Sequence, residues 1–458
     1  MRNTILAAAL ALAFPVAFAQ GTPSGSSVEL YGLLDTGLES LDVGGVSVLR
    51  LSSGISAGSR WGVRGRESLG NGYTALFTLE SRIELDTGQM TNRGPIYYCG
   101  TSGAAVTCPG IALLPPATSL PAANQAGILG GVNSVNQTLA QAVTTVNGVG
   151  ALFDRQALVG IITPVGALLL GRQYTPGYEI LNKFNSFADA TSGQMGQQYA
   201  TLAIRANNAV QYRAEAAGAI VTAMYGFGGT DGIRTERSTN PTNGDDFMGF
   251  NAQYATSAFA VGVGYNQNKV VTFDAPGEAR TGLKTLNVGV SGTFANFKLF
   301  GQYMSRKNDN PVLTPEDLQG VVISSGGNAS VINSTLGALY INPWDVDGMR
   351  GFVGPIDTRV YHLGATWTEG NGTLTLAFNT ATDSARSSWA IDDAKVKHYA
   401  IGYFYSFSKR TTGYGAVSKA DNSGQSRLAL GAAGYAGGLT TDFGKDSRAI
   451  QLGMRHAF

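Results

Sequence analysis

The segment 449–458 constrains the fold most tightly, because its apolar and polar residues alternate one by one. Ile450, Leu452 and Met454 fall on one side of an extended chain, and Gln451 and Arg455 fall on the other. Successive side chains of a strand point to opposite faces, so the pattern predicts a strand with one apolar face. An unpaired strand edge invites aggregation, and this strand must therefore pair with another part of the chain.

The same alternation recurs along most of the sequence. Residues 47–52 and 59–66 are expected to form one continuous strand, which brings the predicted count to about 16. The predicted strands cover residues 28–38, 47–66, 73–85, 156–162, 167–173, 209–213, 220–227, 249–256, 259–266, 285–294, 297–305, 360–367, 373–380, 397–407, 413–418 and 449–458. An even count of this size is typical of bacterial outer-membrane barrels.

The composition favours a barrel in lipid over a soluble protein. Charged residues make up 14% of the chain and 62 residues are glycine, whereas about 25% of the residues of ordinary globular domains are charged. The mean hydropathy is near zero, as it is when an apolar exterior and a polar lumen cancel. The sequence therefore predicts an all-β fold, a transmembrane antiparallel β-barrel.

Short and long connections alternate between the predicted strands. Short turns fall at 70–72, 164–166, 217–218, 295–296, 369–372 and 409–411, and long loops at 87–152, 175–208, 228–246, 307–358 and 421–447. Short periplasmic turns opposite long external loops are typical of outer-membrane barrels. Periodicity alone leaves a soluble β-sandwich as the alternative.

The amino terminus reads as an export signal. Arg2 supplies a positive charge, residues 5–14 form an apolar run, and residues 17–19 give a small-x-small cleavage pattern before Gln20. We expect a signal peptide at 1–19 and one barrel domain at 20–458, exported to the outer membrane. The formal net charge of +1 gives no signal for nucleic-acid binding.

The two cysteines, Cys99 and Cys108, lie close together in the first long loop. Export permits a disulfide, so a small loop staple is the prediction for this pair. A metal site is disfavoured because no third or fourth Cys or His lies nearby.

Several short motifs in order resemble the general diffusion porins of the beta-proteobacterial type, found in Neisseria, Bordetella and Burkholderia. They are 26–32 (SSVELYG), 50–54 (RLSSG), 59–65 (SRWGVRG), 170–176 (LGRQYTP), 205–212 (RANNAVQY), 405–411 (YSFSKRT) and 453–458 (GMRHAF). The resemblance implies a 16-stranded homotrimer in the outer membrane, surrounded by lipid and lipopolysaccharide, that passes small ions and hydrophilic solutes. It also implies that Phe458 is a signal for the barrel-assembly machinery. Loop 87–152 departs from the family by its length; in similar porins this loop contacts the neighbouring subunit.

The resemblance places the loop 175–208 inside the barrel, where it forms the constriction with Glu179 and Asp189. It assigns pore-lining arginines to Arg60, Arg172 and Arg205. Parity adds Arg82, which shares a strand face with the carboxylates at 80 and 84. An arginine on the lipid face costs roughly 2–4 kcal/mol at the midplane, so the lumen is the expected side.

For two arginines, the alternation of strand faces does not indicate the lumen. Arg172 shares its parity with Leu168 and Leu170, so only the resemblance favours the lumen for it. Arg155 shares its parity with Ala157 and Val159, and it is not included among the pore-lining residues.

Four arginines against two carboxylates favour a porin with anion preference. The alternative is that these charged side chains are solvated in the lumen, screened by salt, and have no effect on ion selectivity. A solute-specific, binding-type channel is the main competitor, and an adhesin or receptor acting through loop 87–152 is another. Enzymatic activity, a cofactor and a metal site are not expected, because the three histidines lie on separate strands and no nucleophile motif is present.

Overall fold

The computed structural model of the chain describes residues 26–90, 92–93, 100–102, 105–107, 145–146, 151–188, 190–195, 204–227, 246–271, 279–308, 356–385, 393–424, 426, 428–431, 440 and 444–458. Cys99, Cys108 and Asp189 lie outside these residues, as does most of loop 87–152. The predicted disulfide and the constriction role of Asp189 therefore stay predictions.

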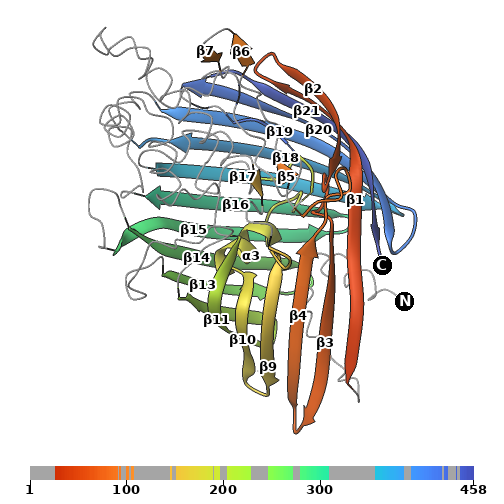
Figure 1. Ribbon diagram of the computed structural model, residues 1–458, viewed down its shortest axis with the longest axis vertical. Helices are drawn as coiled ribbons and strands as arrows, with labels where there is room; N and C mark the ends of the chain where they lie inside the picture. The colour runs from red at the N-terminus through yellow and green to blue at the C-terminus, as the bar shows by residue number, and fades with distance from the viewer. Residues whose placement is uncertain are drawn as a thin grey trace.

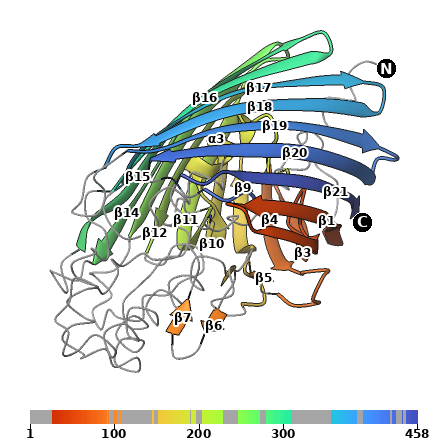
Figure 2. The ribbon, with the colours of Figure 1, turned by 90° about the horizontal axis from the view of Figure 1, so that it is seen from above.

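Seventeen strand segments of the described chain form one antiparallel sheet that wraps round a central helix (Figures 1 and 2). The segments are β1 (Ser27–Val43), β2 (Ser47–Ser53), β3 (Arg60–Gly70), β4 (Tyr73–Arg82), β9 (Gln156–Thr163), β10 (Gly166–Tyr174), β11 (Arg205–Ala216), β12 (Ala219–Gly226), β13 (Phe247–Ala255), β14 (Phe259–Val271), β15 (Ala279–Phe294), β16 (Phe297–Asn308), β17 (Ile356–Glu369), β18 (Gly372–Asp383), β19 (Ala394–Ser406), β20 (Thr411–Gly424) and β21 (Ser447–Ala457). Outside the sheet, β5 (Asn92–Arg93) pairs with β8 (Thr145–Val146), and β6 (Gly100–Ser102) pairs with β7 (Ala105–Thr107).

Two of these segments share one position in the wall. β2 pairs with residues 36–42 of β1, and β3 pairs with residues 27–33 of the same strand. They therefore form a single wall strand that is interrupted at 54–59. Counting them together gives a 16-stranded antiparallel barrel, which confirms the predicted fold class.

The last strand closes the barrel against the first. β21 pairs with β1 from Leu33–Ala457 to Val43–Ser447. Beyond the strand, the backbone N–H groups of Gly32 and Phe458 each donate to the carbonyl oxygen of the other at 3.1 Å. The prediction that the terminal strand pairs with another part of the chain is confirmed: its partner is β1, and no edge of the sheet faces lipid at this seam.

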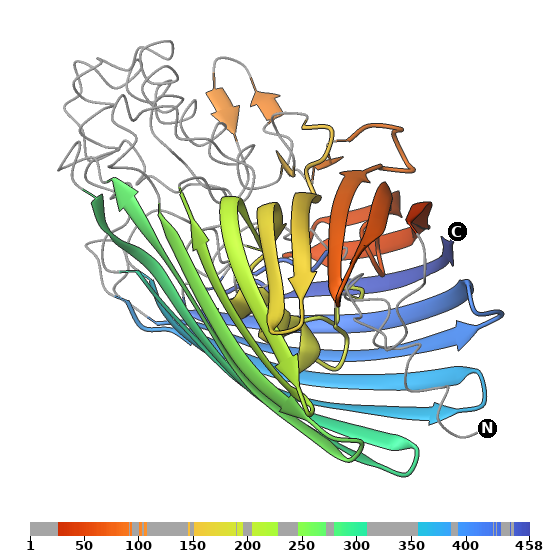
Figure 3. The ribbon, with the colours of Figure 1, turned by 90° about the horizontal axis from the view of Figure 1, so that it is seen from below.

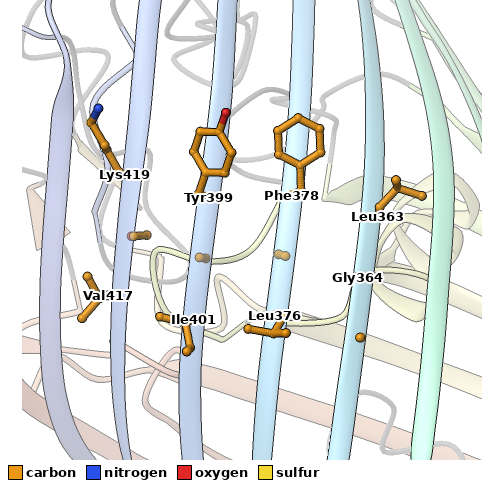
Figure 4. A pocket seen from close by; sticks show the side chains of 12 residues that line it. Leu363, Gly364, Leu376, Phe378, Tyr399, Ile401, Val417 and Lys419 are labelled. Atoms are coloured by element: carbon orange, nitrogen blue, oxygen red, sulfur yellow. The ribbon is translucent and has the colours of Figure 1, made fainter.

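Alternation along each strand separates an apolar outer face from a polar inner one. On β21, the exposed fractions of Ile450 and Leu452 are 58% and 65%, whereas Gln451 is buried on the inner side. Figure 4 shows the outer face of β17–β20, where Leu376, Ile401 and Val417 line a shallow apolar groove of about 580 Å³. This groove opens away from the lumen.

Tight turns join neighbouring strands at one end of the barrel. The β3–β4 turn places Asn71 and Gly72 at φ of 52° and 81°, the left-handed conformation that two-residue hairpin turns require. The helix α3 (Pro176–Lys183) lies inside the barrel between its two walls (Figure 3). Within the described residues, no helix combines the length and apolar character needed to span a membrane.

Candidate functional site

The chain turns into the barrel directly after β10 and returns at the start of β11. The backbone N–H of Thr175 donates to the carbonyl oxygen of Ile204 at 3.0 Å, so the two ends of the inserted segment meet at the wall. We call the segment 175–204 the constriction loop. Its first part is α3, which the sequence analysis did not predict as a helix. Pro176 at the first helical position, and Glu179 four residues before Lys183, are the signals for it.

A row of lumen-facing residues supports the loop. Each member is the register partner of the next, with one residue on each strand from β13 to β19. We call this row the loop seat; it consists of Gln253, Gly262, Gly289, Gln302, His362, Asn379 and His398.

Polar members of the loop seat bind the loop directly. The Lys183 ammonium donates to the side-chain oxygen of Gln253. Further along the row, the Gln302 amide donates to the carbonyl oxygen of Ile180 at 3.5 Å. The backbone N–H of Ser186 donates to His362 Nε2 at 3.1 Å. The loop therefore follows the row from β13 to β17.

Glycines in the loop seat let the loop lie close to the wall. The Phe184 ring packs on Gly262 and Gly289, where an added Cβ would approach Phe184 atoms to 2.8 Å and 2.3 Å respectively. A contact under 3.0 Å forces either the wall or the Phe184 ring to shift, so glycine is the residue that fits at these two positions without displacing the loop. Phe184 is completely buried as a result.

The remaining members form a chain of side-chain hydrogen bonds. His362 accepts from the loop through Nε2, so its Nδ1 carries the proton that is shared with Asn379 Oδ1 at 2.6 Å. The Asn379 amide nitrogen in turn donates to His398 Nδ1 at 2.9 Å. All three side chains are buried. This arrangement fixes the position of the loop above β17–β19.

The far end of the loop crosses the seam between the first and last strands. The Thr191 N–H donates to the carbonyl oxygen of Ile55 at 2.8 Å, in the interruption between β2 and β3. The Ser192 N–H donates to Gln451 Oε1 on β21, also at 2.8 Å. The loop is thus attached on both sides of the seam.

Opposite the loop seat, on the wall from β3 to β11, four of the arginines contact the side chain of Glu80, Asp154 or Tyr174, and we call them the arginine cluster: Arg60, Arg82, Arg155 and Arg205. Glu80 lies between two of them. Its Oε1 accepts from Arg155 Nε at 2.7 Å, and its Oε2 is 3.8 Å from Arg60 Nε. The Arg60 side chain retains 17% exposure.

Arg82 is held by two carboxylates. Its Nε is 2.9 Å from Asp154 Oδ2, and its Nη1 is 3.6 Å from Glu84 Oε1. Burial raises the pKa of Asp154, but the charges of Arg82, Arg205 and Arg155 outweigh this effect and leave the pKa below its usual value. The Asp154 carboxyl is therefore ionised at neutral pH.

Arg155 was missed by the sequence analysis. It precedes the first residue of β9, so the strand parity that grouped it with Ala157 does not apply to it. Its guanidinium is buried and bonds to Glu80 and to the Tyr174 hydroxyl. The pattern of the strand alone carries no signal for this placement.

Arg172, which was expected to line the pore, lies apart from the arginine cluster. Arg172 pairs with Ala157 and keeps the outward parity of Leu170, and its guanidinium donates to Asn207 Oδ1 and to the carbonyl oxygen of Asp154 at 2.5 Å each. The structure therefore does not bring Arg172 into the arginine cluster.

Glu179 is buried against the wall beneath α3. Its Oε2 accepts from Arg213 Nη1 at 3.0 Å and from Asn251 Nδ2 at 2.9 Å. Glu179 thus lies in the constriction loop, as expected, but its arginine partner is Arg213 and not a member of the arginine cluster. Within the described part of the chain, no group of three or more His, Cys, Asp or Glu side chains is placed to hold a metal ion.

Comparison with known proteins identifies the family. The family model described as Gram-negative porin matches residues 6–425. Outer membrane porin protein 32 of Delftia acidovorans is 24% identical over 471 residues, covering all of both chains.

Solved structures show the same fold. The anion-selective porin from Comamonas acidovorans superposes with a TM-score of 0.62 at 24% identity, covering 94% of this chain and 100% of that one. The trimer form of OmpT, an outer membrane protein of Vibrio cholerae, gives a TM-score of 0.56 at 15% identity, covering 95% and 100%. The chain described here belongs to the Gram-negative porins, the outer-membrane β-barrels that form channels for passive diffusion.

Proposed function

We propose that this porin conducts small hydrophilic solutes and prefers anions. The observation that carries the proposal is the charge balance of the arginine cluster. Its four guanidinium groups face three carboxylates, Glu80, Glu84 and Asp154. Among the described side chains of this cluster, positive groups therefore outnumber carboxylates where the wall faces the loop.

The buried position of these arginines does not remove their effect. Low-dielectric walls focus the field of fixed charges into a water-filled passage. Arg60 is half-buried, and its side chain is more exposed than those of Arg82 and Arg155. This excess of positive groups over carboxylates therefore favours negative ions in the passage.

The loop adds further positive charge. Glu179 is neutralised by Arg213, whereas neither Lys183 of α3 nor Lys298 of β16 forms an ion pair with any described carboxylate. Both lysines are half-buried on the lumen side. Anions that pass the loop therefore meet unneutralised ammonium groups.

Two solved structures of similar fold support the proposed anion preference and a trimeric assembly. The Comamonas porin with the same fold is described as anion-selective, and the Vibrio OmpT structure is a trimer. We propose that this chain is also a homotrimer embedded in outer-membrane lipid and lipopolysaccharide, assembled by the barrel-assembly machinery and without catalytic activity.

The test is a reversal-potential measurement with purified protein in a planar bilayer under a tenfold KCl gradient. Anion preference gives a potential of the sign set by chloride, and its size decreases in Arg155→Gln because one charge of the cluster is lost. A potential of the sign set by potassium would overturn the proposal. Conductance that saturates with salt would instead favour a binding-type channel.

A further inference from the structure

Two lysines from different elements lie on the lumen side, at the end of the barrel that carries the tight turns. Lys183 is the last residue of α3 and is bonded to Gln253, close to the end of β13 that leads into the turn to β14. Lys298 is the second residue of β16, directly after the turn at 295–296. Tight turns face the periplasm in outer-membrane barrels, so the two lysines lie towards the periplasmic mouth of the pore.

Neutral groups hold both ammonium groups. Lys183 donates to the side-chain oxygen of Gln253, and its ammonium lies 5.7 Å from the centre of the Phe184 ring. The Lys298 ammonium lies 4.9 Å from the centre of the Phe300 ring. Among the described residues, no carboxylate forms an ion pair with either lysine. The amide and the ring faces thus orient the two ammonium groups without supplying a negative charge.

The two ammonium groups also act on each other. Burial and the charges of Lys298 and Arg213 together lower the pKa of Lys183 to about 8. The Glu179 and Glu215 carboxylates oppose this shift less strongly, and Glu179 is already paired with Arg213 at 3.0 Å. Holding two positive groups near each other is unfavourable, and an anion bound between them offsets their repulsion.

The chemistry of the pair suits a small anion with two negative charges. A lysine ammonium carries three donors on a flexible four-carbon stem, so it adapts its direction to a ligand. Lys298 projects from the wall, whereas Lys183 is carried by the constriction loop. Two such groups can donate to different oxygens of one tetrahedral oxyanion. A chloride ion has a single charge and compensates only one of them.

We propose that Lys183 and Lys298 form a binding site for small divalent oxyanions, such as sulfate or phosphate, on the periplasmic side of the constriction loop. The site lies on the wall of the loop seat and is separate from the arginine cluster on the opposite wall. This inference rests on the proposed anion preference and deepens it. Preference for anions requires no bound ion, whereas this site retains a divalent oxyanion as it passes.

The test uses sulfate, which carries two charges at neutral pH. Single-channel conductance of the purified full-length porin is measured at pH 7 in a fixed KCl background, with potassium sulfate added in the millimolar range. We expect sulfate to lower the conductance with saturation, because the bound dianion obstructs chloride. Methanesulfonate has a tetrahedral sulfur but only one charge, so it should lower the conductance less at the same concentration.

Lys298→Met replaces the ammonium with an apolar chain of similar length. The sulfate concentration that gives half of the maximal inhibition should rise by about threefold or more in this variant, and Lys298→Arg should stay closer to wild type. Lys284→Met is the matched control, because it removes a lysine that is exposed on the outer side of β15. It should leave the half-inhibition concentration unchanged.

A second variant keeps the experiment decisive if Lys298→Met inserts poorly. Lys183→Met removes the other ammonium and should show a similar rise. If sulfate does not inhibit an anion-selective wild type, or inhibits it and the two methionine variants equally, this inference alone is overturned. A cation-selective reversal potential of the wild type overturns the proposed function instead.

Discussion

A single methyl group on Gly289 provides a sharp test of how the constriction loop is held. This glycine lies beneath Phe184, and a Cβ at position 289 would come within 2.3 Å of the ring. Ordinary contact begins at 3.4 Å, so one side must retreat by about 1.1 Å. Gly289→Ala is therefore an overpacking substitution at the loop seat.

The wall cannot supply that movement. β15 is paired along its length with β14 on one side and β16 on the other, so a local shift would break the ladder of two strands. The loop must move instead, and it can move only into the lumen. We expect a lower single-channel conductance, together with a loss of about 1–3 kcal/mol in the free energy of unfolding.

The measurement is single-channel recording in a planar bilayer, with thermal unfolding on the same preparations. Gly292→Ala is the control, because a Cβ at this position on the same strand meets nothing within 4 Å. If Gly289→Ala conducts like Gly292→Ala and wild type, the loop does not rest on Gly289 in the membrane and the reasoning fails.

Three further predictions concern Lys183, Arg205 and Phe458. Burial and the charges of Lys298 on β16 and Arg213 on β11 lower the pKa of Lys183 to about 8, and the Glu179 and Glu215 carboxylates oppose this shift less strongly. The ammonium is charged below this pKa and neutral above it, so the anion preference measured by reversal potentials should decline from pH 7 to 9. The variant Lys183→Met should not show that decline. Arg205→Gln should lower the anion-to-cation permeability ratio, taken from the reversal potential, by about twofold. An unchanged ratio would show that this guanidinium does not set the selectivity. Phe458→Ala should reduce the amount of folded porin in outer-membrane fractions, measured by the heat-dependent shift on gels, and normal amounts would show that the terminal ring is not needed for assembly.

The strands were predictable because lipid on one side and water on the other impose a period of two. Every predicted strand has a counterpart in the sheet, but the strand expected to be continuous over 47–66 is interrupted between β2 and β3. The structure lengthens several of them: the strand expected at 209–213 runs over Arg205–Ala216. The added residues carry a weaker apolar alternation, so the pattern gave no reason to include them.

The constriction was harder to predict, for reasons that differ between residues. Arg155 lies just outside a strand, where parity says nothing about direction. Glu179 was expected to face the pore, but α3 turns it towards Arg213, and a partner on another strand is not visible in the local sequence. The loop seat depends on the register of seven strands at once. Periodicity identifies which face a residue is on, but not which residue lies beside it.

The attachment of the constriction loop on both sides of the seam has a consequence for the order of assembly. Ser192 and Gln451 are 259 positions apart, and their hydrogen bond can form only after β21 has been made and delivered to the lumen side. Contacts of such long range form late because the chain between them must first be ordered. The pore therefore reaches its final width after the wall is complete, and a barrel that is still open at the seam has a passage that no loop has yet narrowed.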